Sequence, residues 1–278
     1  VLEENGFEAY AVGGCVRDSL IGKKPDDWDI ACSAKPEQVK ALFHKTIDTG
    51  IRHGTVTVMM KHVGYEVTTY RIDGEYVDGR HPKKVIFTPS LTEDLKRRDF
   101  TINAMAYSDR TGIVDIFDGV GDLKKKVIRC VGNPNERFGE DALRILRAVR
   151  FSAQLGFSIE EKTMQAAKEL AENLKKISRE RIHTELDKLI MSKHPDHVKL
   201  LESLDILPHI FLGYVCHGET AALADRLMRS DKEHYIRWAL FITNISFENL
   251  LESLKFDNKS IKICNIMKKY ADEELRAD

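Results

Sequence analysis

The sequence lacks several signatures that would place it in a class at once. Its 278 residues contain no Cys-x-x-Cys pair, no Gly-x₄-Gly-Lys-Ser/Thr loop and no His-Asp dipeptide. No apolar run approaches the ~20 residues that cross a bilayer, and no secretory leader is recognisable. These absences argue against structural zinc, a standard P-loop, an appended metal phosphohydrolase and a membrane protein.

Composition describes an ordinary globular protein with two or three domains. Hydrophobic residues make up 42% and charged residues 31% of the chain, and the net charge is −1. A neutral chain can still carry a local basic patch, so the net charge says nothing about nucleic acid. The cysteines are odd in number and scattered, which indicates reduced thiols and a cytoplasmic protein. They are Cys15, Cys32, Cys130, Cys216 and Cys264.

The stretch 10–30 organises the chain. An apolar run ends in Gly13-Gly14, and an amphipathic turn over 16–20 follows, which predicts a strand, a glycine turn and the start of a helix. Glycines let backbone N–H groups approach a phosphate, and a helix N-terminus favours an anion.

A second strand is predicted over 27–31, with Asp27 and Asp29 on one face and Trp28 and Ile30 pointing into the core. Two adjacent carboxylates repel each other unless a cation lies between them. Hard oxygen ligands of this kind suit Mg²⁺.

Two motifs together resemble a known family. Gly-Gly-x-Val-Arg-Asp followed by Asp-x-Asp is similar to motif A of the class II tRNA nucleotidyltransferases and bacterial poly(A) polymerases. Arg97-Arg98-Asp99-Phe100-Thr-x-Asn103-Ala is similar to motif B. The resemblance implies that Asp27 and Asp29 are catalytic and hold two Mg²⁺ ions. It also implies that Asp99 and Asn103 organise the ribose, and that phosphates and ribose are held by Gly14, Arg17, Arg98, Arg147 and Arg150.

Between these motifs, alternating residues over 54–60 and 64–71 predict an antiparallel hairpin. Glu66 lies in its second strand, either as a surface residue or as a third carboxylate helping the pair. The polar stretch 73–84 resembles the flexible loop that the family needs to add the final adenosine. Residues 115–123 resemble the third motif, with Ile116 where proline is commoner; we assign it a turn and no chemistry.

From Asn135 the apolar period becomes 3.6. One helix is predicted to carry Glu140-Asp141 and Arg144, Arg147 and Arg150, with the arginines opposite an apolar side formed by 142, 145, 146 and 149. Asp141 and Arg144 form either a solvated i,i+3 pair or a nucleotide-binding pair. Glu-Asp-x-x-Arg resembles motif D, the family's base reader. A carboxylate beside a guanidinium is complementary to cytosine and adenine.

The sequence therefore predicts an α+β protein. Residues 1–131 would form a nucleotidyltransferase head of polymerase-beta type with a mixed or antiparallel sheet. Residues 132–192 would form a helical neck and residues 193–278 a helical body. The chain begins at Val1 and ends in a charged helical pattern, so we expect it to be trimmed, with little of the family's helical tail.

The resemblance covers roughly residues 7–260 and implies a class II CCA-adding enzyme, which extends the 3′ end of tRNA with C, C and A from CTP and ATP. Addition of A alone, a bacterial poly(A) polymerase and a non-catalytic RNA-binding module are the alternatives. No membrane partner is expected, and the oligomeric state is not predicted.

Overall fold

A computed structural model describes residues 1–74, 85–214, 218–245 and 247–274. The chain divides into two compact units, Val1–Asn133 and Pro134–Asp278. The first is built on a mixed sheet and the second is almost wholly helical, so the predicted α+β class is confirmed.

The first unit contains a seven-stranded sheet in the order β3-β4-β5-β2-β1-β8-β9. β2 and β5 run parallel, and the other neighbours in this sheet run antiparallel. The strands are β1 (Ala9–Val12), β2 (Asp29–Cys32), β3 (Thr46–Gly50), β4 (Thr55–Met60), β5 (Val63–Thr69), β6 (Arg71–Asp73), β7 (Val85–Phe87), β8 (Met105–Ser108), β9 (Gly112–Asp115) and β10 (Val127–Ile128). The helices are η1 (Glu3–Asn5), α1 (Gly14–Leu20), α2 (Pro36–Leu42), η2 (Ile51–His53), α3 (Leu91–Lys96), η3 (Thr101–Asn103) and α4 (Gly119–Lys125).

The predicted hairpin is formed by β4 and β5. Its turn contains Lys61 and His62, both with positive φ (48° and 67°), as a tight two-residue hairpin turn requires. Alternation buries Val56 and Val67 on one face. Glu66 therefore faces the other way, and the parallel register pairs it with Asp29 of β2.

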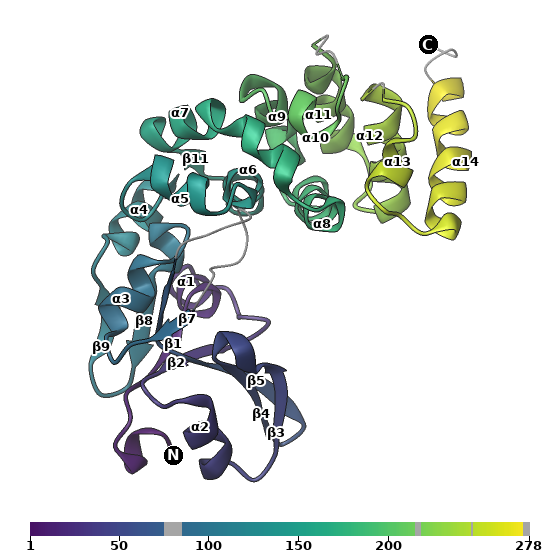
Figure 1. Cartoon of the computed structure of the whole chain (residues 1–278). Coiled ribbons are helices and arrows are strands. Elements are labelled where there is room, and N and C mark those ends of the chain that lie inside the picture. Colours follow the sequence, from purple (N-terminus) through teal and green to yellow (C-terminus); the bar gives the residue numbers. More distant parts are fainter. Residues whose placement is uncertain (75–84, 215–217, 246, 275–278) are drawn as a thin grey trace. The chain divides into compact units, whose positions relative to one another are not determined.

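Two apolar clusters hold the sheet in place. One contains Val39 of α2 together with Val56 and Val67. The other contains Leu95 of α3 and Tyr70 against Val12 of β1. α2 and α3 are labelled in Figure 1. Val12, the last residue of β1, is thereby packed in the core directly before the glycine turn.

One side chain near the site was predicted wrongly. Trp28 was expected in the core, but it is 41% exposed. β2 begins at Asp29, so Asp27 and Trp28 precede the strand and do not follow its alternation.

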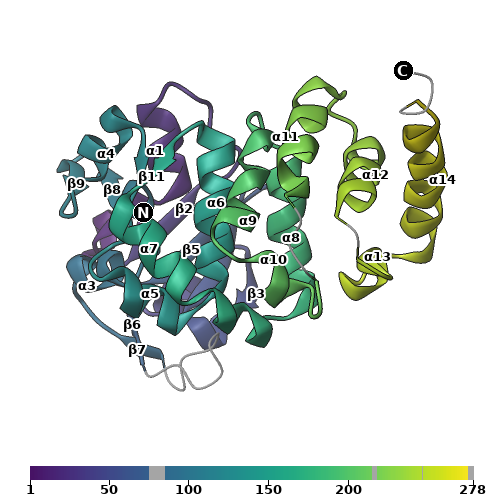
Figure 2. The ribbon, with the colours of Figure 1, turned by 90° about the horizontal axis from the view of Figure 1, so that it is seen from above.

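The second unit is a series of short helices. They are α5 (Pro134–Glu140), α6 (Leu143–Leu155), α7 (Glu161–Glu169), η4 (Ala171–Lys176), α8 (Arg179–Ile190), η5 (Pro195–Lys199), α9 (Leu200–Ser203), α10 (Leu207–Ile210), α11 (Glu219–Arg229), α12 (His234–Asn244), α13 (Leu250–Ser253) and α14 (Asn258–Glu274), with one short strand, β11 (Ser158–Ile159). α6 packs against α8, and α12 against α14, as Figure 2 shows for the latter pair. Trp238, Phe211 and Phe241 are fully buried in its core.

The helix predicted to carry both Glu140 and the arginines is broken. Glu140 ends α5, Asp141 lies between the two helices, and α6 begins at Leu143. The Asp141 carboxylate accepts a hydrogen bond from Leu143 N (3.0 Å), because a short acidic side chain can satisfy a free N–H at a helix start. Hydrophobic periodicity does not reveal such a break.

Among the described residues, no helix is long and apolar enough to cross a membrane. The four cysteines in that part of the chain, Cys15, Cys32, Cys130 and Cys264, are buried free thiols.

Candidate functional site

The carboxylates of Asp27, Asp29 and Glu66 are near enough to interact electrostatically: Asp29 opens β2, Asp27 precedes that strand, and the parallel register places Glu66 of β5 beside Asp29. Burial, followed by the negative charges of Asp27 and Glu66, raises the pKa of Asp29 above its ordinary value. The positive charge of Arg98 opposes this effect. Mutual repulsion of this kind is relieved when a cation binds between the groups. Of the two readings of Glu66, the structure thus favours a third carboxylate beside the pair.

The donor chemistry of this cluster fits a hard divalent cation. The three groups offer oxygen ligands only, which suit Mg²⁺. Within the described ranges, no three His, Cys, Asp or Glu side chains converge closely enough to form a metal cage. An ion here would therefore take the rest of its ligands from water and substrate, as Mg²⁺ commonly does in phosphate chemistry.

The glycine turn follows β1 beside this cluster. Gly13 has φ +79°, and a Cβ at this position would lie 3.1 Å from Nη1 of Arg98. A side chain would therefore be strained by the backbone and would crowd the guanidinium. At Gly14 a Cβ would meet Arg17 Nη2 at an ordinary 3.7 Å. Gly14 was the glycine predicted to bind nucleotide; the structure shows that Gly13 is the position that excludes a side chain.

Arg17 and motif B form one hydrogen-bonded chain. Arg17 Nε and Nη2 donate to the two Asp18 oxygens at 2.9 Å, and Nη1 donates to Asn103 Oδ1 at 2.6 Å. Asn103 Nδ2 in turn donates to Asp99 Oδ1 (3.2 Å), which also caps Phe100 N. Hydrogen bonds thus link Arg17, predicted to hold phosphate or ribose, to Asn103 and Asp99, predicted to organise the ribose, and they hold the buried Arg17 in place.

Arg98 lies at the end of α3. Its Nη2 donates to Asp94 Oδ2 at 3.2 Å, and its side chain is 18% exposed. With Gly13 on one side and the charge of Asp29 nearby, Arg98 can bind an anion placed over the carboxylates.

In the second unit, each described arginine of α6 lies near a carboxylate. Arg144 Nη1 donates to Glu140 Oε2 at 2.6 Å. Arg150 Nε donates to Glu185 Oε2 at 2.5 Å, and Arg147 Nη1 lies 3.9 Å from Glu185 Oε1. Arg147 and Arg150 also lie over the Phe151 ring, with Cζ 5.2 Å and 3.8 Å from its centroid.

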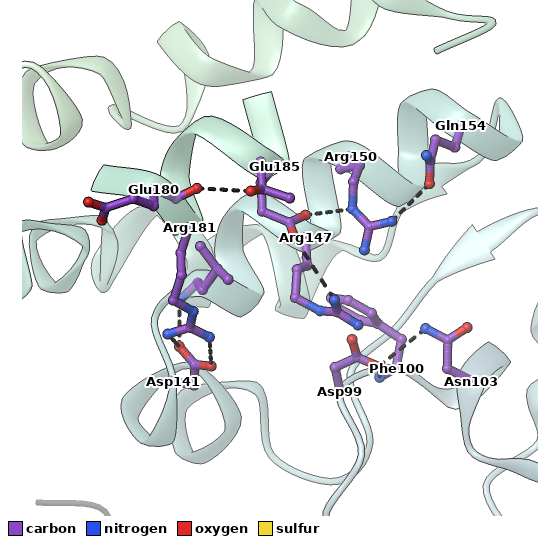
Figure 3. Close-up of polar contacts among 12 residues, drawn as sticks. Asp99, Phe100, Asn103, Asp141, Arg147, Arg150, Gln154, Glu180, Arg181 and Glu185 are labelled. Atoms are coloured by element: carbon purple, nitrogen blue, oxygen red, sulfur yellow. Dashed lines mark hydrogen bonds and ion pairs between the residues drawn. The ribbon is translucent and has the colours of Figure 1, made fainter. Parts of the chain in front are cut away.

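Asp141 is held by α8. Arg181 Nη2 donates to Asp141 Oδ2 at 2.6 Å, and Nη1 donates to Oδ1 at 3.3 Å, so the ion pair is bidentate. Figure 3 shows Arg181 turned toward Asp141 and Glu185 reaching Arg150. α8 thereby orients the residues at the start of α6 and those along it, through side chains one helical turn apart.

These contacts correct the predicted geometry of the arginine helix. Arg144 and Arg150 are only 9% and 6% exposed, so they do not form a solvated face. Asp141 forms its ion pair with Arg181, and Arg144 forms one with Glu140, so the structure does not contain the solvated i,i+3 pair that was one of the two alternatives. The compensating acids come from α5 and α8, which the sequence of α6 alone could not show.

Comparison with known proteins follows the same division. Residues 9–129 match the family model for the poly A polymerase head domain. Residues 156–215 match the model described as the probable RNA and SrmB-binding site of polymerase A. A CCA-adding enzyme of Leuconostoc mesenteroides is 48% identical over 250 residues, 89% of this chain and 62% of the relative. One of Lactobacillus delbrueckii subsp. bulgaricus is 58% identical over 192 residues, 69% of this chain and 48% of the relative.

A solved structure decides the family. The CCA-adding enzyme of Bacillus stearothermophilus in complex with CTP superposes with a TM-score of 0.86 at 38% identity, over 98% of this chain and 68% of that one. This chain belongs to the CCA-adding enzyme family. It spans between 48% and 66% of the length of the curated CCA-adding enzymes that it matches. The predicted family is thereby confirmed.

Sequence reasoning missed several residues that form ion pairs with the predicted site residues. Asp94, Glu140, Arg181 and Glu185 each hold a predicted site residue in place. Glu140 was part of the stretch that resembles motif D, but nothing in the sequence said which partner it would take. The loop predicted over 73–84 lies largely outside the described residues, which omit 75–84.

Proposed function

We propose that this chain adds C, C and A to the 3′ end of tRNA from CTP and ATP, releasing pyrophosphate at each step. The carboxylate cluster of Asp27, Asp29 and Glu66 beside Arg98 and the Gly13 turn supports this function most directly. Membership of the CCA-adding enzyme family, with a relative whose structure contains CTP, supports the choice of substrate.

Asp27 and Asp29 are the proposed catalytic residues and metal ligands. Nucleotidyltransferases generally use divalent metals, and oxygen-only ligands favour Mg²⁺ here. The bound ion would neutralise phosphate charge and favour ionisation of the tRNA 3′-hydroxyl. Glu66 adds a third negative charge that strengthens the hold of this cluster on a cation.

The chain's own residues position the nucleotide. Arg98 binds the triphosphate, and the backbone at Gly13 and Gly14 lets phosphate oxygens come close. Arg17 braces Asn103 and Asp99, which orient the ribose. Positioning and charge neutralisation supply most of the catalysis in phosphoryl transfer.

In the second unit, Asp141 and Arg144 read the base, and Arg147 and Arg150 carry positive charge for the phosphates. Cytosine and adenine both present an amino donor next to a ring acceptor, which a carboxylate and a guanidinium can bind together. The two groups are fixed by Arg181 and Glu140, so the choice of base is built into the protein.

We further propose the division into neck (132–192) and body (193–278), and a cytoplasmic location, where tRNA, CTP and ATP meet.

Incorporation of labelled nucleotides tests this function. The chain is incubated with Mg²⁺, labelled CTP or ATP, and tRNA transcripts that end at the discriminator base, at C or at CC. We expect two C residues and one A on the first transcript. Addition of A alone to the CC transcript would identify an A-adding enzyme, a long A tail a poly(A) polymerase, and no incorporation a binding module.

A further inference from the structure

Asp94 is a buried charge that none of the proposed chemistry uses. It lies on α3 and is 0% exposed. Ser90 caps the helix through Glu93 N, so Asp94 is not needed for that cap. Its carboxylate instead accepts hydrogen bonds from the guanidinium groups of Arg97 and Arg98 and from the backbone N–H of Arg71, at the start of β6.

Each oxygen of Asp94 has its own partners. Oδ1 accepts from Arg97 Nη2 (2.7 Å) and Nε (3.0 Å) and from Arg71 N at the start of β6 (3.3 Å). Oδ2 accepts from Arg98 Nη2 (3.2 Å). Burial alone would raise the pKa of Asp94, but the charges of Arg97 and Arg98 hold it below its ordinary value, so the group is ionised.

Arg98 depends on this one contact for its orientation. Among the residues that the structure describes, Asp94 is the side chain that accepts a hydrogen bond from Arg98, and the buried Arg98 Nε has no acceptor. Nη1 of Arg98 is left beside Gly13, 3.1 Å from where a Cβ would be. Asp94 on one side and the missing side chain of Gly13 on the other therefore set where this guanidinium points.

Stability alone does not explain such an arrangement. A buried ion pair contributes little to stability compared with well-packed apolar side chains of the same volume. Asp94 lies near the buried Leu95 and Tyr70, and an apolar residue at its position alone would leave the guanidinium groups of Arg97 and Arg98 without this carboxylate. A carboxylate is retained here, we propose, because Asp94 is the positioning residue that aims Arg98 at the triphosphate over the carboxylate cluster.

This inference rests on the proposed function, since it requires a triphosphate beside Arg98. Its signature is that Asp94 acts only through Arg98. Hydrogen bonds that involve charged groups are worth enough that Asp94→Asn should weaken CTP binding about tenfold to hundredfold. KM for CTP should rise while KM for the tRNA stays unchanged, because Asp94 affects the nucleotide alone.

A double-mutant cycle tests it on the whole chain. CTP affinity in the presence of Mg²⁺ is measured by calorimetry for the wild type, Asp94→Asn, Arg98→Ala and the double variant. We expect the double variant to bind no more weakly than Arg98→Ala alone. Glu93→Gln, a change at the neighbouring carboxylate, is the matched control and should bind like the wild type. Should Asp94→Asn fail to fold, Asp94→Glu keeps the charge, displaces it by one methylene, and takes its place in the cycle.

Additive losses, or an unchanged affinity in the Asp94 variant, would overturn the inference. A wild-type chain that binds CTP but incorporates nothing into tRNA would overturn the proposed function and leave the cycle decisive for Asp94. A wild-type chain that binds no CTP would overturn both.

Discussion

In the sheet unit, Asp29 lies beside two carboxylates of like charge, whereas in the helical unit Arg150 lies against Glu185 and Arg144 against Glu140. The first arrangement raises the free energy of the folded protein, and a bound cation would relieve the repulsion. In the second, two carboxylates, Glu140 and Glu185, lie against three arginines, so the positive charge is balanced only in part. Carboxylates that repel one another mark a candidate site of chemistry, whereas the side chains proposed to read the base are held by neighbouring ion pairs.

The largest expected effect breaks the unbalanced side of this comparison. Asp29→Asn or Asp27→Asn removes a charge that the metal needs, and metal binding supplies several kcal/mol, so transfer should fall by roughly 10³-fold or more. Labelled CTP incorporation measures this loss. The same Asp29→Asn variant should unfold at an equal or higher temperature, because repulsion with Asp27 and Glu66 is relieved.

Asp48→Asn is the matched control, because Asp48 is an exposed carboxylate of β3 that pairs with Lys40. Its activity should stay at the wild-type level. A retained activity in Asp29→Asn, or a marked drop in its melting temperature, would contradict the idea of an unbalanced metal-binding cluster.

The next effect concerns the balanced side. Glu185→Ala leaves the guanidinium of Arg150 buried without its carboxylate, which should cost about 3–5 kcal/mol of unfolding free energy. Urea unfolding followed by circular dichroism measures this cost. Glu180→Gln, an exposed position five residues earlier on the same helix, should change stability little. Equal stability of the two variants would show that Arg150 is not balanced by Glu185.

The different origins of the two charge arrangements explain what the sequence could predict. The motifs of the sheet unit are each short and continuous: the glycine turn and Asp27-x-Asp29 lie within seventeen positions of each other, and motif B occupies 97–104. The contacts between these motifs, such as that of Arg17 with Asn103 86 positions away, were not predicted. The β4–β5 hairpin was predicted because its alternation is strict, and the mixed or antiparallel sheet was implied by the resemblance to the family. Trp28 was misplaced, since the strand begins one residue after it.

The helical unit was less readable because its pairs are distant in sequence. Arg150 and Glu185 are 35 positions apart, and Asp141 and Arg181 are 40 apart. Periodicity showed which side of α6 is apolar, yet it could not show that α8 covers the arginine side as well. The break at Asp141 was missed for a different reason: a continuous helix and an interrupted helix show the same apolar periodicity.

A third, intermediate effect sharpens the role of the balanced charges. Arg181→Ala releases Asp141 without removing it, so the choice of nucleotide should relax even though the proposed base-reading residue remains. A good bidentate contact with a base discriminates against the wrong base by roughly 1–3 kcal/mol, so UTP and GTP use should rise about tenfold to hundredfold relative to CTP and ATP. Competition assays with mixed nucleotides measure it.

Asp141→Ala should give the same relaxation, and combining the two changes should add little. Glu180→Gln again serves as the control on α8. If neither variant changed nucleotide preference, the pair would be only a structural ion pair, and the assignment of Asp141 as a base-reading residue would fail.

The smallest effect is a pH dependence confined to the helical unit. Burial, against an opposing contribution from Asp196, lowers the pKa of His197 below its ordinary 6.5, and nearby His194 and Lys199 act in the same direction as burial. His197 also shares a hydrogen bond with Ser152 of α6. The unfolded chain binds this proton more readily than the folded one, so unfolding free energy is fully retained above about pH 6.5 and declines as the pH falls below it. The pKa of His183 is also lowered, again chiefly by burial, so His183 adds to the dependence of unfolding free energy on pH. Urea midpoints between pH 7.5 and 5 should therefore shift downward, and His197→Gln should flatten part of that shift. A slope that is the same in His197→Gln as in the wild type would mean that His197 binds its proton equally well in the folded and the unfolded chain.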